Sequence, residues 1–309
     1  MTFPRLVHDK IVIGVPVRNE GRYIRETLDS LAAQTHDDFL VLISDNASTD
    51  DTQAICQGFV ANDTRFHYHR NESNVGASRN LNYLKEATDS PYFMWFSGHD
   101  VLAPDYLREQ LRVLQGDQSI ALAFSNVQWI DQDGAHLRVS DGGSLVHENN
   151  SGILRYLACV SGPWDECTAV NGLFRRSALS GSRFQEIPGP DHIVLTRAQF
   201  FGKFHRSEPP LYYRRNFAQR TEGYLERIGN DSQKSRGSSV ASLYRATCAA
   251  QVRDYLSLPF PTFAKLALFP YLLWNLDIGY GCVSERVGRS RLVRIATRLR
   301  ASVRRYSRR

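Results

Sequence analysis

Four groups of residues among the first hundred positions carry side chains that could bind a nucleotide or a metal ion. They are Pro16, Arg18, Asn19 and Glu20; Asp45 and Asn46; Asn74, Gly76, Arg79 and Asn80; and Ser97, Gly98, His99 and Asp100. Carboxylates and histidine can hold a divalent ion, while arginine and amide groups can bind phosphate or a base. Isolated acids beside helix N-termini suit a nucleotide whose diphosphate is bridged by a divalent metal.

Each group follows a stretch with the pattern of a buried β-strand. Strands are expected over residues 10–17, 38–45, 65–70 and 92–97, and helices over residues 19–35, 48–62, 74–88 and 104–115. Ser48 is the expected N-cap of the second helix. Alternating strands and helices predict a parallel sheet with helices on both faces, which binds ligands at the carboxyl ends of its strands. The four groups should therefore meet at one edge of the sheet.

The remainder of the chain has a more mixed pattern. It predicts a hairpin over residues 119–139, a strand running into a helix over 168–179, helices over 153–160, 189–203 and 240–256, and the end of the folded body at 208–215. We predict an α/β fold: a doubly wound, mostly parallel sheet with flanking helices and a C-terminal helical extension. Its expected parts are residues 1–115, 116–215 and 216–309.

Two long stretches carry a resemblance to a known family. "IGVPVRNEGRYIRETLDSLAAQTHDDFLVLISDNASTDDT" and "NVGASRNLNYLKEATDSPYFMWFSGHDVLAPDYL" resemble the GT-A glycosyltransferases of family 2, inverting enzymes that use nucleotide sugars. The segments "VNGLFRRSAL" and "GPDHIVLTRAQFFGKFH" resemble the acceptor half of that family more weakly. The resemblance implies a GT-A fold, with residues 1–115 holding the donor and residues 116–215 the acceptor.

The resemblance also implies roles for individual residues. The donor would be bound by Pro16, Arg18, Glu20, Asp45, Asn46, Gly76, Arg79, Ser97 and Gly98. Asp45 matches an aspartate that holds the uracil or ribose side of the nucleotide, and Arg79 is placed to meet the base or the diphosphate. Asp191 matches the general base that takes a proton from the acceptor hydroxyl.

The chain departs from the family pattern at the metal motif. Where the family usually has Asp-x-Asp-Asp, this chain has Ser97-Gly98-His99-Asp100, and Pro190 replaces the glutamate before Asp191. His99 and Asp100 are the expected ligands of a divalent ion, Mn²⁺ or Mg²⁺. Fewer carboxylates make such a site poorer for Mg²⁺ and relatively better for softer ions.

Composition and missing motifs exclude several other classes. The chain of 309 residues has an ordinary globular composition, and its five scattered cysteines lack a CxxC pair, which favours a reducing compartment. GxGxxG and GxxxxGK[ST] are absent, and the spacing after Asp45 does not fit an EF-hand. A nucleotidyltransferase would need a glycine-rich basic loop after the first strand. The loop "PVRNEG" has only one arginine and one glycine, so this class is not favoured.

The basic character of the chain lies in its tail. Residues 285–309 contain ten arginines and one acid, so the rest carries a net charge of about −3, against +6 overall. Nucleic-acid binding is therefore not expected. Residues 289–306 have the pattern of a basic amphipathic helix, which favours docking on anionic lipid, although a solvated tail or a protein partner would give the same pattern. Lys265 and Asp277 bracket eleven uncharged residues, too few to span a bilayer.

Together these features predict a cytoplasmic enzyme, peripheral on the inner face of the cell membrane. It would transfer a sugar from a nucleotide diphosphate, expected to be a UDP-sugar, to a hydroxyl of a glycan or lipid-linked acceptor. The alternative is a catalytically silent GT-A module that binds a nucleotide or a glycan, because the metal motif has lost acids.

Overall fold

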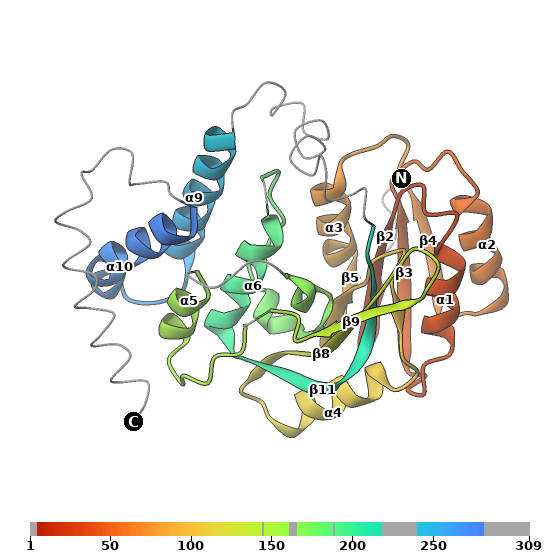
Figure 1. The fold of residues 1–309 in the computed structure, drawn as a ribbon, viewed down its shortest axis with the longest axis horizontal. Helices are drawn as coiled ribbons and strands as arrows, with labels where there is room; N and C mark the ends of the chain where they lie inside the picture. Colours follow the sequence, from red (N-terminus) through yellow and green to blue (C-terminus); the bar gives the residue numbers. More distant parts are fainter. Residues whose placement is uncertain (1–4, 144, 161–165, 188, 218–239, 281–309) are drawn as a thin grey trace.

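The computed structural model describes residues 5–143, 145–160, 166–187, 189–217 and 240–280. In this part of the chain a nine-stranded sheet forms the centre of the molecule, with most strands in the order β4-β3-β2-β6-β10-β8-β11-β7 and β9 paired to β8 (Figure 1). Its strands are β2 (Ile11–Val17), β3 (Phe39–Asp45), β4 (Phe66–Arg70), β6 (Tyr92–Trp95), β7 (Val101–Leu102), β8 (Ile120–Ile130), β9 (His136–Ser140), β10 (Leu173–Arg175) and β11 (Lys203–Arg215). A small separate pair joins β1 (Leu6–Val7) to β5 (Thr88–Asp89).

The strand directions confirm the expected architecture in its first half. Strands β4, β3, β2 and β6 are all parallel to their neighbours, so their carboxyl ends lie at the same edge of the sheet. Beyond them β10 runs antiparallel to both β6 and β8, while β11 is parallel to β8. The sheet is therefore mixed, with its parallel part formed by the residues that precede the four polar groups.

Helices cover both faces of the sheet. They are α1 (Ile24–Ala32), α2 (Thr52–Asn62), α3 (Ala77–Glu86), α4 (Tyr106–Gly116), α5 (Gly152–Val160), α6 (Pro190–Phe201), α9 (Val240–Ser257) and α10 (Thr262–Tyr280), with single 3₁₀ turns η1 (Thr168–Asn171) and η2 (Arg176–Leu179). Alternate residues of β2 enter different cores: Ile13 packs in a cluster with Leu28 of α1, and Val12 in a cluster with Leu84 of α3. This period of two is the reason β2 is apolar throughout.

Two local predictions need correction. The second helix begins at Thr52, and Ser48 is not its N-cap, because the Ser48 hydroxyl donates to Asp45 instead. The helix expected after the strand near 173 is only the single turn η2. The segment at 208–215 forms the last part of β11, a strand of 13 residues between β8 and β7. The hairpin over 119–139 is confirmed as β8 and β9.

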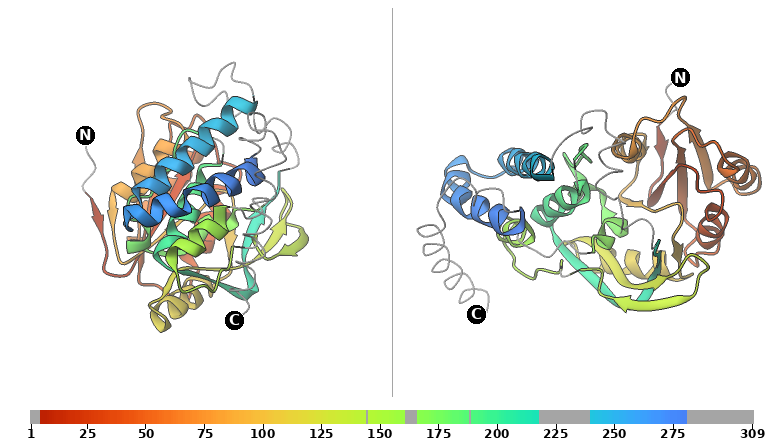
Figure 2. Two further views of the ribbon diagram at one scale, coloured as in Figure 1. Left: turned by 90° about the vertical axis from the view of Figure 1, so that its left-hand side faces the viewer. Right: turned by 45° about the horizontal axis from the view of Figure 1, so that its top comes forward.

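The C-terminal helices share a small core with the body. Side chains of α5, including Tyr156, pack with Tyr255 of α9 and with Leu272 and Leu276 of α10. Figure 2 shows these three helices together at one end of the molecule, away from the parallel strands. None of the helices in the described residues combines the length and apolar character that a membrane span requires. The predicted amphipathic helix at 289–306 lies outside the described residues.

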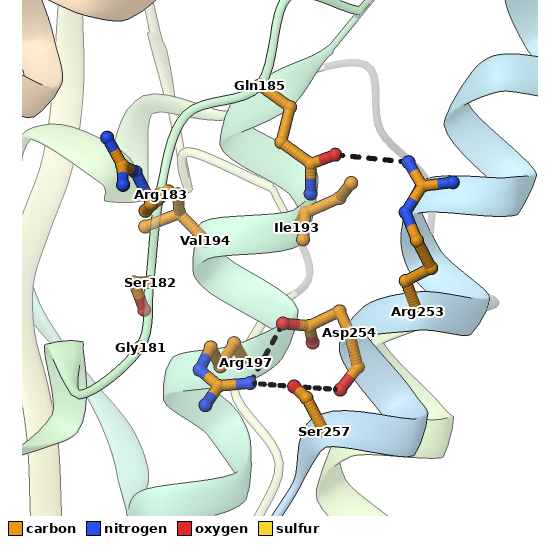
Figure 3. A pocket seen from close by; sticks show the side chains of 10 residues that line it. All are labelled: Gly181, Ser182, Arg183, Gln185, Ile193, Val194, Arg197, Arg253, Asp254 and Ser257. Carbon is orange, nitrogen blue, oxygen red and sulfur yellow. Dashed lines mark hydrogen bonds and ion pairs between the residues drawn. The ribbon is translucent and has the colours of Figure 1, made fainter.

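A buried ion pair joins α9 to α6. Arg197 donates to Asp254 at 2.9 Å, and each side chain is only 8% exposed. The pair lies beside a pocket formed by α6, α9 and the segment 181–185, which Arg183 and Arg253 also line (Figure 3). Burial raises the pKa of Asp254, and the Arg197 charge opposes that shift. Because a buried charge without its partner is costly, this pair should hold the C-terminal helices on the body.

We expect Asp254→Asn to lower the free energy of unfolding by about 3 kcal/mol, because it leaves the Arg197 guanidinium buried without a counter-charge. Urea unfolding followed by circular dichroism measures this loss. Arg253→Gln is the matched control, since Arg253 is exposed and its contact to Gln185 is 3.5 Å long. An equal stability for both variants would contradict the assigned role of the pair.

Candidate active site

The loops that follow β2 and β3 are hydrogen-bonded to each other. The Asn19 amide donates to the Ser48 hydroxyl at 3.0 Å, and the Asn19 side chain accepts from the Thr49 amide at 2.8 Å. The Glu20 amide donates to the Thr52 hydroxyl at 2.9 Å, at the start of α2. Asn19 itself has a positive φ of 54°, a conformation that asparagine tolerates better than most residues. The first two polar groups therefore form one rigid unit.

Asp45 is the anchor of this unit. Its side chain has no solvent exposure, and one carboxylate oxygen accepts from the amide and hydroxyl of Ser48, at 2.8 and 2.6 Å. The other oxygen accepts from the Tyr68 hydroxyl and from Arg70, both at 2.6 Å. A contact of Asp45 with a nucleotide stays a prediction. Its carboxylate is placed to shape the loop on which a nucleotide would lie.

Amide side chains connect the second polar group to the third. Asn46 donates to Asn74 at 2.7 Å, and its side-chain oxygen accepts from the Val75 amide at 2.9 Å and from Asn71 at 3.2 Å. Gly76 follows with φ +86°, a conformation open to glycine, and directly precedes α3. This loop lies at the N-terminus of α3, where a negative group such as phosphate is stabilised.

Two arginines of the predicted donor site are exposed. Arg18 lies in the loop after β2, beside the half-buried Pro16. The Arg79 side chain is 69% exposed and donates to Glu186 at 2.9 Å, so it bridges α3 to the segment before α6. An exposed ion pair of this kind is worth less than about 1 kcal/mol, so Arg79 could exchange Glu186 for a phosphate at little cost.

The fourth polar group meets the first. The His99 Nδ1 lies 3.1 Å from Glu20 Oε1, and both side chains are largely buried. Gly98 packs so tightly on the end of β2 that a Cβ there would lie 2.8 Å from Val17 Cγ1. On its other side, the Ser97 hydroxyl accepts from the Asn171 amide group at 3.2 Å. All four groups thus lie at one edge of the sheet, as the sequence predicts.

Asp100 is hydrogen-bonded to the end of β11. It is 1% exposed, and its two oxygens accept from the Tyr212 hydroxyl at 2.6 Å and from the Arg215 amide at 2.8 Å. Arg215 also donates to the His99 carbonyl and to Glu26, so the end of β11 is fixed to this loop. Asp100 therefore joins two segments of the fold, and its role as a metal ligand stays a prediction.

Asp191 lies in the first turn of α6, after Gly189 in a left-handed conformation and Pro190. The Cys167 thiol donates to the Asp191 carboxylate. One ligating atom from each of Cys167, Asp191 and His192 lies within 4.8 Å of the others. Burial raises the pKa of the Cys167 thiol well above its usual value, and the Asp191 charge raises it further. Burial lowers the pKa of His192, which favours its neutral ring.

The short helix η1 connects Asp191 to the strand-end groups. Cys167 is the N-cap of η1, and Asn171 at its other end donates to both Ser97 and Tyr212. A 3₁₀-helix of this length spans about 8 Å. Asp191 is therefore linked to the strand-end groups through one short helix.

The loop after β6 fits a divalent ion only through His99. With Nδ1 turned to the Glu20 carboxylate, the ring keeps Nε2 for a metal, the arrangement in which a carboxylate orients a histidine ligand. Sequence reasoning did not identify Glu26, Asn171, Tyr212, Arg215 and Cys167 as parts of the site. The signal of the first four is weak because they lie 74 to 189 positions from their partners at the strand ends, and Cys167 lies 24 positions before Asp191.

Comparison with known proteins decides the family. A family model described as Glycosyl transferase family 2 matches residues 12–181, more than half of the chain. The chain belongs to this family. It is 31% identical over 122 residues to a putative teichuronic acid biosynthesis glycosyltransferase, TuaG, of Bacillus subtilis, which covers 40% of the chain and 48% of TuaG. An uncharacterized glycosyltransferase of Methanocaldococcus jannaschii is 26% identical over 118 residues, or 38% of the chain and 41% of that protein.

The chain spans less than half the length of these curated relatives. Solved structures match more of it: S. aureus TarS 1–349 in complex with UDP-GlcNAc has a TM-score of 0.62 at 16% identity, over 91% of the chain and 76% of TarS 1–349. A mannosyltransferase from Pyrobaculum calidifontis, in complex with GDP-Man and Mn²⁺, has a TM-score of 0.53 at 13% identity, over 98% and 84%. These likenesses confirm the predicted GT-A fold.

We expect Asp100→Ala to lower the free energy of unfolding by about 3 kcal/mol, because the Tyr212 hydroxyl and the Arg215 amide lose their buried acceptor. Thermal and urea unfolding test this. Asp133→Ala, at an 81% exposed side chain, should change stability by less than about 0.5 kcal/mol. A fully stable Asp100→Ala protein would instead favour an acid held for ligand binding.

Proposed function

We propose that this chain is an inverting glycosyltransferase. It transfers a sugar from a nucleoside diphosphate, a UDP-sugar, to a hydroxyl of a glycan or lipid-linked acceptor. The observation that carries the proposal is the meeting of four polar groups at the ends of parallel strands, with Asp191 one short helix away, in a chain of glycosyl transferase family 2. The naming of TuaG for teichuronic acid biosynthesis supports a polysaccharide acceptor, and the UDP-GlcNAc complex of TarS supports the UDP donor.

In this proposal the strand-end loops hold the donor. The nucleobase lies beside Pro16, Arg18 and Glu20, on the loops that Asp45 holds together. Asn46 and Gly76 shape the backbone at the N-terminus of α3, which faces the phosphates. Arg79 exchanges its ion pair with Glu186 for one with the diphosphate. The sugar contacts Ser97 and Gly98.

Asp191 is the proposed general base. Its carboxylate takes the proton of the acceptor hydroxyl while the hydroxyl oxygen attacks the anomeric carbon from the face opposite the leaving diphosphate. The attack forms the new glycosidic bond, breaks the bond to the diphosphate and inverts the anomeric centre. The Cys167 thiol, which donates to this carboxylate, would orient it.

A divalent ion would be held through His99, with Glu20 as the orienting carboxylate. When bound, the ion would neutralise charge that develops on the leaving diphosphate. Asp100 fixes the loop that carries His99 through its contacts to Tyr212 and Arg215. This is a weaker site than one with two free carboxylates, and it favours Mn²⁺ over Mg²⁺.

We expect Asp191→Asn to lower the release of UDP from UDP-sugars by about 100-fold or more, since the amide cannot accept the acceptor proton. Its affinity for UDP, measured by isothermal titration with Mn²⁺, should stay within about twofold of the wild type. Asp141→Asn, at a half-exposed side chain paired with Arg206, is the matched control and should turn over normally.

Two outcomes would contradict this proposal. A wild type that binds neither UDP nor GDP would exclude a nucleotide-sugar site. A wild type that binds UDP but releases it from sugars no faster than Asp191→Asn would identify the catalytically silent GT-A module instead.

We also propose that the C-terminal part docks on an anionic membrane surface on the cytoplasmic side. Along one face of α10 lie Phe263, 76% exposed, and Leu266, 68% exposed, with the partly exposed Leu273 two turns beyond. The arginine-rich residues 285–309 follow this helix directly in sequence. Apolar side chains next to a cationic segment match the interface of a bilayer that contains anionic lipid.

We expect the Phe263→Glu, Leu266→Glu double variant to bind phosphatidylserine-containing vesicles at least about tenfold more weakly than the wild type, because burial of two large apolar side chains is lost. Vesicle co-sedimentation measures this. Leu256→Glu, on α9 and 49% exposed, is the control. Equal binding of all three proteins, or of the wild type to neutral and anionic vesicles, would contradict membrane docking through this face.

A further inference from the structure

Three side chains with different ligand chemistry, one of them the proposed base, meet at the start of α6. Cys167, Asp191 and His192 place a sulfur, a carboxylate oxygen and an imidazole nitrogen within 4.8 Å of one another. They come from two elements: Cys167 is the N-cap of η1, and the other two are in the first turn of α6. Helix α6 holds its two residues next to each other, so only the approach of η1 is needed to complete the group.

The combination of thiol, carboxylate and imidazole is suited to zinc. Zn²⁺ takes four ligands at about 2.0–2.3 Å in a tetrahedron, which separates neighbouring ligand atoms by about 3.5 Å. Atoms already within 4.8 Å reach that spacing through small changes in side-chain torsions. Three protein ligands leave one position for water, the pattern of an open zinc site.

The charges of the group also match a divalent ion. A thiolate and a carboxylate together offset the charge of Zn²⁺, so the complex is neutral. The positive end of the α6 dipole therefore disfavours zinc binding only weakly. Zinc binding replaces the proton of the Cys167 thiol, so the affinity for zinc should rise with pH.

We propose that Cys167, Asp191 and His192 bind Zn²⁺, and that zinc inhibits this protein reversibly by occupying the Asp191 carboxylate. The inhibition rests on the proposed function of Asp191, whereas the binding of zinc does not. The site is separate from the one proposed at His99, which holds the ion for the diphosphate.

The other possible metal group among the described residues, His8, Asp9 and Asp38, has a weaker case. Asp9 is 90% exposed, and Asp38 is already paired with Lys10, which lowers the pKa of its carboxyl. An ion there would compete with a lysine charge in open solvent. It also lacks the sulfur ligand that selects zinc.

Cobalt titration of the full chain, in a non-thiol reductant, tests the binding. Co²⁺ takes the same tetrahedral sites, and a cobalt–thiolate bond gives a charge-transfer absorption that carboxylates and imidazoles do not give. We expect this absorption in the wild type and in Cys248→Ser, the control for another partly exposed cysteine, and its displacement by Zn²⁺. Cys167→Ser should lose the absorption, and His192→Ala should bind Co²⁺ more than tenfold more weakly.

An absent band in the wild type, or a band that survives in Cys167→Ser, would overturn the zinc site. Turnover tests the inhibition by zinc: Zn²⁺ should inhibit UDP release by the wild type and Cys248→Ser. The metal-free rate of Cys167→Ser should be lower than that of the wild type, because the thiol orients Asp191, and Zn²⁺ should not lower that rate further. Cobalt binding without inhibition of an active wild type would keep the metal site and overturn the inhibition, with Asp191 excluded as the base. A protein that shows the cobalt band but no turnover would keep the metal site and reject the proposed function.

Discussion

The carboxylate of Asp100 is the contact on which the candidate site depends. It accepts hydrogen bonds from the Tyr212 hydroxyl and the Arg215 amide, which lie 112 and 115 positions later in the chain. Through these bonds the end of β11 is fixed against the loop after β6, and Arg215 then reaches Glu26 next to the loop after β2. A buried carboxylate must have such partners, because an unpaired charge in the interior is costly. The same contacts hold His99 where it meets Glu20.

Asp45 follows the same physical rule at the next strand end. Its four hydrogen bonds arrange Ser48, Tyr68 and Arg70 around one wholly buried carboxylate, and so fix the loop between β3 and α2. Asp45 and Asp100, two acids that the family resemblance associates with ligands, thus bind other groups of the protein. The groups proposed to meet a ligand are exposed or half-buried: Arg18, Arg79 and the His99 ring.

The sequence was sufficient for the parallel half of the fold and for the edge at which the polar groups meet. Strand patterns predict β2, β3, β4 and β6, and parallel pairing then brings their carboxyl ends together by geometry alone. It was not sufficient for the direction in which each acid points. That direction is set by distant partners such as Tyr212, which lies on β11 between β8 and β7. The sequence pattern also predicts Ser48 as a helix cap, because it does not show that the Ser48 hydroxyl binds Asp45.

We propose that a nucleotide sugar lies across the ends of β2, β3 and β6, with Asp191 facing its reacting carbon. A crystal structure with UDP and Mn²⁺ would show this arrangement. We expect the uracil ring over the loops of Glu20 and Asp45, the diphosphate near Arg79, the ion on His99, and Asp100 still bonded to Tyr212. Nucleotide bound elsewhere, Asp191 turned away from the diphosphate, or Asp100 released from Tyr212 to hold the ion would contradict it.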